Sequence, residues 1–201
     1  MPFETDTHWP TRLVKLFKIC RGQGGKGGML ESRYNGPVNA MLTYCLQVGL
    51  GEEFDYVIGP QVPADPDHPH SAIDFVVSAV IHDQFKPVLL IEIKDDTWAT
   101  SATQRYHADA QMRQRFHAML NACPLPDLHG LSLLGTSLRV YRGTVATYSV
   151  DPMLEECPST EEVPPSNFLE GAWDRDLLSP GGLKEMQRIV SYIVTEVAKL
   201  S

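Results

Sequence analysis

The sequence predicts an α/β fold with a central mixed β-sheet flanked by helices on both faces. Two observations support this prediction. Segments whose apolar residues recur every three or four positions alternate along the chain with short apolar segments typical of strands. The predicted order is helix, three strands, helix, further strands and a final helix, which is expected when one sheet is covered on each side.

Four segments are expected to be helical because their apolar residues lie at helical spacing. They are residues 11–20, 29–48, 100–122 and 183–200. Pro37 is a point at which the second helix could bend, and the glycines of residues 49–51 would end it. Pro124 would prevent the third helix from continuing.

Six strands are expected, at residues 54–62, 71–81, 87–94, 131–134, 138–141 and 145–150. The second and third are the clearest, and a turn over residues 82–84 would join them as a hairpin. Residues 142–144 would join the last two strands. Both faces of the central hairpin are mainly apolar, as in a sheet that is covered on each side.

The chain of 201 residues is expected to form a single domain. Its core would span about residues 29–150, followed by an acidic, loop-rich connection at 151–180 and a C-terminal helix at about 183–200. The net charge of −8 is concentrated in residues 146–201, which carry ten acids and four bases. Residues 12–33 carry six bases and one acid, so either a polyanion docks there or these bases form a solvated helix face.

Nothing in the sequence indicates export or membrane insertion. The first residues include acids and prolines, unlike a signal peptide, and no apolar run approaches the ~20 residues of a membrane span. The four cysteines lie far apart with no Cys-x-x-Cys pair, so neither a disulfide framework nor a zinc knuckle is indicated. We therefore expect an intracellular protein, cytoplasmic or nuclear, that is not secreted and has no membrane partner.

Charged residues occur at one end of the central hairpin. Side chains alternate across a strand, so Glu92 and Lys94 share one face of the third strand. A turn centred on Asp83 is nine residues from both Asp74 and Glu92, which places the two carboxylates opposite each other. Directly opposed residues have Cβ atoms about 4.5–5.5 Å apart. We therefore expect Asp74, Glu92 and Lys94 to form one polar site.

Two carboxylates this close beside apolar neighbours repel each other and lose hydration, so positive charge must compensate them. Lys94 supplies one charge. A divalent cation would supply more, and oxygen ligands at this spacing suit Mg²⁺ or Mn²⁺. The alternative is an exposed hairpin end at which Glu92 and Lys94 are merely solvated.

An acid in one strand followed by Glu-x-Lys in the next resembles the active-site motif of the PD-(D/E)XK nuclease superfamily. The matching residues are Asp74 and Glu92-Ile93-Lys94, and Ile73 stands where the motif's name has proline. The superfamily core, a restriction-endonuclease-like fold, has the order helix, three strands, helix, strand. Residues 29–141 are expected to reproduce this order.

The resemblance implies a role for each of these residues. Asp74, Glu92 and the backbone carbonyl of Ile93 would bind the metal, and Lys94 would orient or deprotonate the attacking water or neutralise developing charge. Many members add a glutamate from the first helix, and Glu31 is the candidate by position. The alternative for Glu31 is an acid that stabilises the dipole at a helix N-terminus.

The helix after the three strands carries the candidates for nucleic-acid contact, which are Arg105, Gln111, Arg113 and Arg115. Arginine and glutamine side chains can hold phosphates and bases. Some members of the superfamily place Gln-x-x-x-Tyr in this helix, and here Arg115 stands at the tyrosine's position after Gln111. The alternative is a solvated helix face.

Two functions follow as hypotheses. The first is a metal-dependent nuclease that cleaves DNA or RNA with Mg²⁺ or Mn²⁺, and the complete set of Asp, Glu and Lys favours it. The second is a catalytically inactive binding module on the same fold, which could form a homodimer through the C-terminal helix. The net charge of −8 favours this module. His68 and His70, just before Asp74, belong either to a polar turn or to a group that binds zinc or assists the water.

Overall fold

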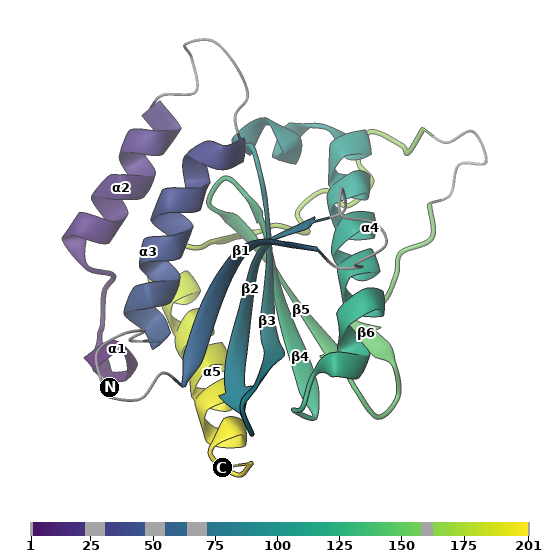
Figure 1. Cartoon of the computed structure of the whole chain (residues 1–201). Helices are drawn as coiled ribbons and strands as arrows, with labels where there is room; N and C mark the ends of the chain where they lie inside the picture. Colours follow the sequence, from purple (N-terminus) through teal and green to yellow (C-terminus); the bar gives the residue numbers. More distant parts are fainter. Residues whose placement is uncertain (1, 23–30, 47–54, 64–71, 158–162, 201) are drawn as a thin grey trace.

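The computed structural model describes residues 2–22, 31–46, 55–63, 72–157 and 163–200, except for the side chains of Pro2 and Glu31. These residues form one central sheet with helices on both of its faces (Figure 1). Helices α3 (Asn35–Leu46) and α5 (Pro180–Val197) lie on one side, and α4 (Ala102–Met119) lies on the other. The prediction of an α/β fold with a mixed, doubly covered sheet is confirmed.

Seven strands form the sheet in the described part of the chain. They are β1 (Tyr56–Pro63), β2 (Ala72–Ile81), β3 (Gln84–Lys94), β4 (Asp127–Leu134), β5 (Ser137–Thr144), β6 (Ser149–Asp151) and β7 (Arg175–Asp176). The first three are consecutive antiparallel neighbours, and β4 lies parallel to β3. Parallel neighbours need a crossover connection, and α4 provides it. Beyond β4, the strands β5, β6 and β7 are again antiparallel, with β6 and β7 both pairing with β5.

The remaining helices are shorter or lie at the outside of the molecule. They are α1 (Pro2–Thr5), α2 (Thr11–Gly22) and the 3-10 helices η1 (Glu31–Tyr34), η2 (Asp96–Thr100) and η3 (Leu120–Ala122). Helix α2 packs on α3 and η1 and forms an outer layer (Figure 1). Of the described helices, none combines the length and the apolar character that crossing a membrane requires.

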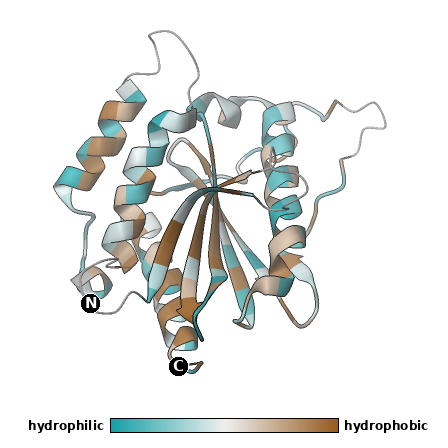
Figure 2. Cartoon of the chain, viewed as in Figure 1, coloured by the Kyte–Doolittle hydropathy of each residue, from teal (hydrophilic) through white to brown (hydrophobic). Residues whose placement is uncertain are grey.

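The apolar residues of the sheet are concentrated in its central strands (Figure 2). Every residue of β3 from Pro87 to Lys94 is buried. Burial on both faces explains why this strand is a continuous apolar run that ends in two charged residues, Glu92 and Lys94. Each fully buried Leu or Ile stabilises the fold by about 1.5–3 kcal/mol, so the strand that carries these charges is rigidly held.

The hairpin between β2 and β3 differs from the expected turn but reaches the expected register. A two-residue turn, His82 and Asp83, joins the strands, and both residues have positive φ angles of 48° and 60°. This is the type I′ conformation that fits the twist of a hairpin. An irregularity between Val77 and Ser78 then shifts the pairing by one residue. The shift offsets the shorter turn, so that Phe75 faces Ile91 as counting about Asp83 predicts.

Helix α4 buries charged residues that a search for apolar spacing assigns to solvent. Arg105, Asp109 and Arg115 are all buried in it, together with the expected apolar positions. Asp109 shows why this is tolerated, because its carboxylate accepts a hydrogen bond from the Tyr141 hydroxyl at 2.7 Å and pairs with Arg113 at 2.7 Å. Buried charges with such partners avoid the cost of an unpaired charge.

Several predicted boundaries are wrong. In the described part of the helix expected at 29–48, residues 31–34 form η1 and the α-helix starts only at Asn35, with Pro37 in the first turn, where proline is tolerated. The expected turn at 142–144 belongs to β5, and the chain turns at residues 145–148 instead. The last helix begins at Pro180, three residues early, because the Ser179 side chain caps it by accepting from the Gly182 N–H.

Candidate functional site

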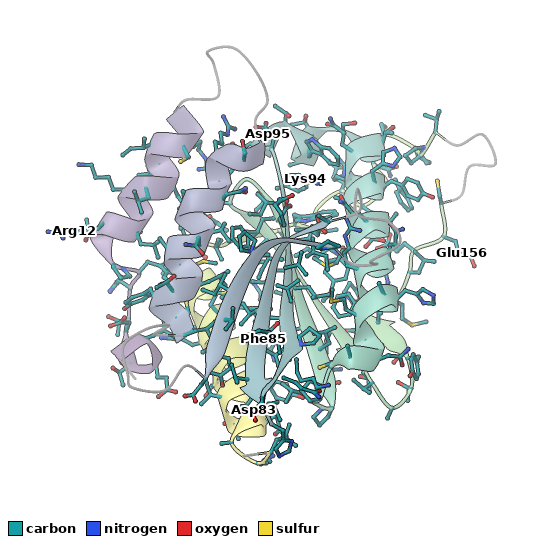
Figure 3. The ribbon with its side chains drawn as sticks, in the orientation of Figure 1. Arg12, Asp83, Phe85, Lys94, Asp95 and Glu156 are labelled. Atoms are coloured by element: carbon teal, nitrogen blue, oxygen red, sulfur yellow. The ribbon has the colours of Figure 1, made fainter. Side chains whose placement is uncertain are left out.

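The two central strands bring Asp74, Glu92 and Lys94 together at one end of the sheet. Phe75 pairs with Ile91, so the next position along each strand places Asp74 beside Glu92. The backbone N–H of Ile93 donates a hydrogen bond of 2.8 Å to Asp74 Oδ2, which ties the carboxylate to the strand that carries the other two residues. Lys94 lies at the opposite end of the hairpin from Asp83 (Figure 3).

Asp74 is held by the strands on both of its sides. Its second oxygen, Oδ1, accepts a hydrogen bond of 3.0 Å from Gln61 Nε2 on β1. Gln61 has a positive φ of 51°, an unusual conformation for a residue other than glycine. In an extended strand, the N–H and C=O of one residue point toward the same neighbour, so the Ile93 carbonyl lies on the side of Asp74. Gln61 was not among the predicted site residues, and no motif in the sequence indicates it.

Glu92 is 2% exposed, and its two oxygens have different surroundings. Oε1 accepts a hydrogen bond of 2.6 Å from Arg115 Nε. Oε2 lies 4.0 Å from Lys94 Nζ and has no hydrogen-bond partner among the described residues. Burial and the charge of Asp74 raise the pKa of Glu92 to about 7, against the opposing effects of Arg115 and Lys94. Glu92 therefore presents one oxygen that is buried and unsatisfied, a state that proteins avoid unless a further group binds there.

Arg115 is the principal charge partner of Glu92. It is 3% exposed, and its Nη2 also donates to the carbonyl of Ala72 at 2.9 Å. The guanidinium thus contacts both strands that carry the acidic pair. Nucleic-acid contact was expected of Arg115, but in this structure its side chain is engaged inside the protein. Sequence spacing alone could not show this, because an arginine in a helix normally indicates a solvated position.

The other predicted contacts on α4 are also engaged or only partly exposed. Arg105 is buried and donates to the backbone carbonyls of Ala99, Ser166 and Phe168 at 2.8–3.0 Å. Arg113 binds Asp109 and the carbonyls of residues 152 and 153. Gln111 is half-buried. The two arginines therefore attach the chain that follows β6 to α4.

Lys94 lies between Glu92 and an aromatic wall. Its ammonium group is 5.4 Å from the ring centroid of Trp98 in η2, a favourable cation–π distance. Lys94 is 7% exposed, so its charge acts in a partly dehydrated environment where electrostatic interactions are stronger than in water. Glu31 belongs to η1, which contacts β3, but its side chain lies outside the described residues, as do His68 and His70.

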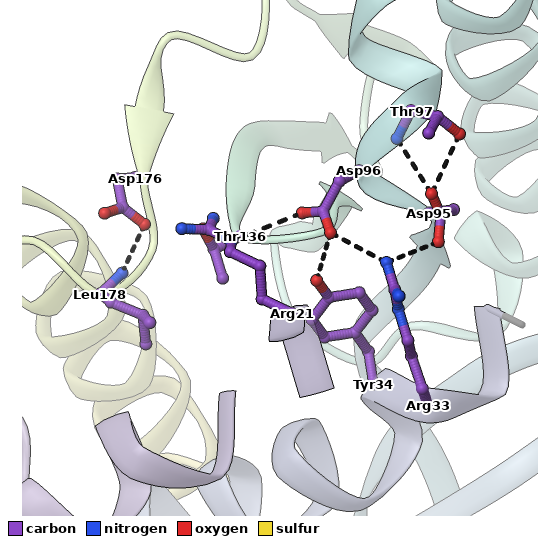
Figure 4. Close-up of polar contacts among 9 residues, drawn as sticks. All are labelled: Arg21, Arg33, Tyr34, Asp95, Asp96, Thr97, Thr136, Asp176 and Leu178. Carbon is purple, nitrogen blue, oxygen red and sulfur yellow. Dashed lines mark hydrogen bonds and ion pairs between the residues drawn. The ribbon is translucent and has the colours of Figure 1, made fainter. Parts of the chain in front are cut away.

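A second polar cluster, which the sequence reasoning missed, follows directly after Lys94 (Figure 4). Arg33 Nη2 lies 2.7 Å from Asp95 Oδ2 and 3.0 Å from Asp96 Oδ2. The Tyr34 hydroxyl donates to Asp96 Oδ2 at 2.5 Å. We call these four residues the strand-end clamp, because they fasten η1 to the chain that leaves β3. In the sequence, the adjacent acids Asp95 and Asp96 could have indicated this cluster.

Gly135 allows the strand-end clamp to approach the hairpin between β4 and β5. A Cβ atom at this position would lie 1.6 Å from Asp96 Oδ1, and the φ angle of Gly135 is +63°. Only glycine both leaves room for Asp96 and adopts this positive φ angle without strain. The Gly135 N–H also donates to the Lys94 carbonyl at 2.8 Å, so the end of β3 is held from the side of β4 as well.

The donor set at Asp74 and Glu92 fits a hard divalent cation. Carboxylate and carbonyl oxygens are the ligands that Mg²⁺ and Mn²⁺ prefer, and the buried Glu92 Oε2 has no other hydrogen-bond partner in the described structure. No group of three His, Cys, Asp or Glu side chains suited to a metal occurs within the described ranges. Further ligands would therefore come from the Ile93 carbonyl, from water or from a substrate, as is usual for Mg²⁺.

No protein-family model matches this sequence, and neither a curated protein nor a solved structure matches it significantly.

Proposed function

We propose that this protein is a metal-dependent nuclease that hydrolyses phosphodiester bonds of DNA or RNA. The observation that carries the proposal is the pair Asp74 and Glu92, with an unsatisfied buried oxygen on Glu92 and the Lys94 ammonium 4.0 Å from it. Paired acids beside a lysine offer both a cation site and a positive group for a phosphate.

The arrangement of elements supports the same proposal. An antiparallel run of three strands follows α3, then α4 crosses over, and β4 lies parallel to β3. This order resembles the restriction-endonuclease-like core, and Asp74 and Glu92-Ile93-Lys94 occupy the positions of the PD-(D/E)XK motif. Membership of that superfamily is part of the proposal.

The chemistry can be assigned to residues of this chain. Asp74 and Glu92, with the carbonyl of Ile93, would hold Mg²⁺ or Mn²⁺. When bound, such an ion lowers the pKa of water and stabilises charge on a phosphate. Lys94 donates hydrogen bonds to the attacking water or to a phosphate oxygen, and Trp98 limits the access of solvent to its ammonium group. Glu31 is the further acidic candidate from η1.

A second candidate function is a catalytically inactive binding module on the same fold. The salt bridge between Glu92 and Arg115 favours it, because it compensates much of the buried negative charge without a metal. In that case Lys94 and Arg115 together would neutralise Asp74 and Glu92, and the site would serve to hold the strands and α4 together.

A cleavage assay separates the two functions. Labelled single- and double-stranded DNA and RNA are incubated with wild type and with Asp74→Asn and Lys94→Met, with Mg²⁺, with Mn²⁺ and with a chelator. We expect metal-dependent cleavage that either substitution reduces by about 10²-fold or more. Asp83→Asn, at the far end of the same hairpin, is the matched control and should cleave like wild type. If cleavage persists in the chelator, or if both site variants cleave like wild type, the proposed metal-dependent site is refuted.

A further inference from the structure

Helix α2 is an exception in an acidic protein. Although the chain has a net charge of −8, residues 11–22 contain four bases and no acid. The bases are Arg12, Lys15, Lys18 and Arg21, at intervals of three residues, and all four are exposed. An exposed helix with bases and no acids lacks the internal ion pairs that usually accompany solvated lysines and arginines.

Because these bases are spaced three residues apart, they form a stripe that winds around α2. A helix advances about 100° per residue, so each successive base lies about 60° behind the previous one. Leu13 and Phe17 fix the orientation, because both are buried against the core. Lys15 consequently faces away from the core, Arg12 and Lys18 flank it, and Arg21 at the end of the helix turns back toward the core side. Figure 3 shows Arg12 at the outer edge of the molecule.

The inner end of the stripe lies beside the candidate site. Arg21 hydrogen-bonds to the Thr136 hydroxyl, and its Nε lies 3.8 Å from Asp96 Oδ1 (Figure 4). Asp96 follows Lys94 by two residues and belongs to the strand-end clamp. The basic stripe therefore runs from the outer surface of α2 to the end of β3 that carries Glu92 and Lys94.

The outer three bases are available for a partner. Within the described ranges, Arg12, Lys15 and Lys18 have no ion pair with an acid. Adjacent bases rise about 4.5 Å along the helix axis and are turned by about 60°, so their charges follow one continuous path along the surface of α2. Their charge and spacing suit a linear polyanion.

We propose that α2 is a docking surface for the phosphate backbone of a nucleic acid, which it guides toward Lys94. The proposal rests on the nuclease function for its substrate, and the charge and position of the stripe carry it. An anionic lipid surface fits less well, because membrane-surface helices insert a broad apolar face. Leu13 and Phe17 are buried in α2, which leaves only Leu16 at 42% and Ile19 at 48% exposure between the bases.

The test measures binding separately from cleavage. Fluorescence anisotropy in the presence of a chelator records the affinity of labelled duplex and single-stranded DNA and RNA for wild type and for Arg12→Gln/Lys15→Gln/Lys18→Gln. Glutamine keeps the helix propensity, and the three side chains are exposed, so the variant should fold normally. Salt is varied between about 50 and 200 mM, because each phosphate contact contributes about 0.9 to the salt slope on a duplex and about 0.7 on a single strand.

The matched control removes three exposed bases from other elements. Arg142→Gln/Lys184→Gln/Lys199→Gln, on β5, α5 and the turn after it, changes the net charge by the same amount. We expect the α2 variant to bind at least about tenfold more weakly than wild type at low salt, with a salt slope lower by roughly 2–3. The salt slope of the control should differ from that of wild type by no more than about 0.9, the contribution of one phosphate contact.

Other outcomes overturn the docking surface. Equal losses in the two triple variants would show only an effect of net charge. Binding to vesicles of anionic lipid that the α2 variant loses, without nucleic-acid binding, would assign the stripe to a membrane surface. Cleavage is measured independently of binding. If binding depends on the stripe but no metal-dependent cleavage occurs, the docking surface stands and the nuclease function is refuted. If metal-dependent cleavage occurs but binding does not depend on the stripe, the nuclease function stands and the docking surface is refuted.

Discussion

Replacing Arg115 by methionine should destabilise the fold strongly. Arg115 and Glu92 are 3% and 2% exposed, so solvent does not screen their interaction as it does on a surface. Methionine keeps an apolar stem of similar length but leaves the Glu92 carboxylate without its hydrogen bond of 2.6 Å. The carbonyl of Ala72 loses its partner as well. Breaking one partner out of a buried ion pair costs about 3–5 kcal/mol, which is the loss expected here.

A second substitution makes this prediction sharper. Converting Glu92 to methionine in the Arg115→Met background removes the stranded carboxylate and its repulsion with Asp74. The double variant should therefore be more stable than Arg115→Met alone, because replacing a whole buried pair by apolar groups is often neutral or stabilising. A simple loss of packing would instead make the double variant the least stable of the three.

The assay is urea unfolding at about pH 8, above the pKa of about 7 that Glu92 has in the wild type. Arg188→Met is the matched control, because Arg188 also pairs with a glutamate, Glu185, but is 54% exposed. Its loss should be about 0–1 kcal/mol. A loss below about 1 kcal/mol for Arg115→Met would refute the reasoning, because it would place the Glu92 carboxylate in contact with water.

Two further predictions concern stability. Burial lowers the pKa of His129 to about 4, below the unfolded value of 6.5. The contribution of neutral His129 to the free energy of unfolding is therefore intact above pH 6.5 and is lost as the pH falls toward 4. This loss is about 3 kcal/mol at most. In His129→Phe, the free energy of unfolding should depend less on pH across this window. Gly135→Ala should cost more than Gly171→Ala, by about 1–3 kcal/mol in urea unfolding, because both glycines have positive φ but only Gly135 adjoins Asp96.

Each of these stability predictions can fail in a defined way. A pH dependence that His129→Phe leaves unchanged would show that other groups control the acid response. The acids Asp127 and Glu185 and the bases Arg142 and Arg188 face His129 and are the groups to test next. Equal costs for the two glycine variants would show that the backbone angle alone matters and that the hairpin can move away from Asp96.

The register of the central hairpin could be predicted from the sequence, but not the turn that produces it. Counting from Asp83 placed Asp74 beside Glu92 by assuming a three-residue turn. The structure reaches this register with a two-residue turn and a one-residue shift near Val77. Both faces of these strands are apolar, so apolar patterning alone does not select one register. The agreement results from the shorter turn and the one-residue shift, which offset each other.

The surroundings of the acidic pair could not be predicted in the same way. A pattern of apolar spacing treats Arg105 and Arg115 as solvent-facing, because nothing local in the sequence shows that a charged helical residue will find a buried partner. Arg115 meets Glu92 only after α4 has packed on the sheet, and Arg105 meets the carbonyls of Ser166 and Phe168 only after the later chain has packed on α4. Gln61, which binds Asp74, is likewise brought there by strand pairing alone.

The most direct test of the candidate site is a calorimetric titration with Mn²⁺ in the absence of nucleic acid. Wild type is compared with Glu92→Gln, which keeps a hydrogen-bond acceptor for Arg115 but loses the charge of the buried carboxylate. Asp83→Asn, at the far end of the same hairpin, also removes one negative charge and is the control for a general effect of charge. A site built on Asp74 and Glu92 predicts one bound Mn²⁺ in wild type and in the control, and a loss of at least about tenfold in affinity in Glu92→Gln. Equal affinity in wild type and Glu92→Gln, or no binding in either, would contradict it.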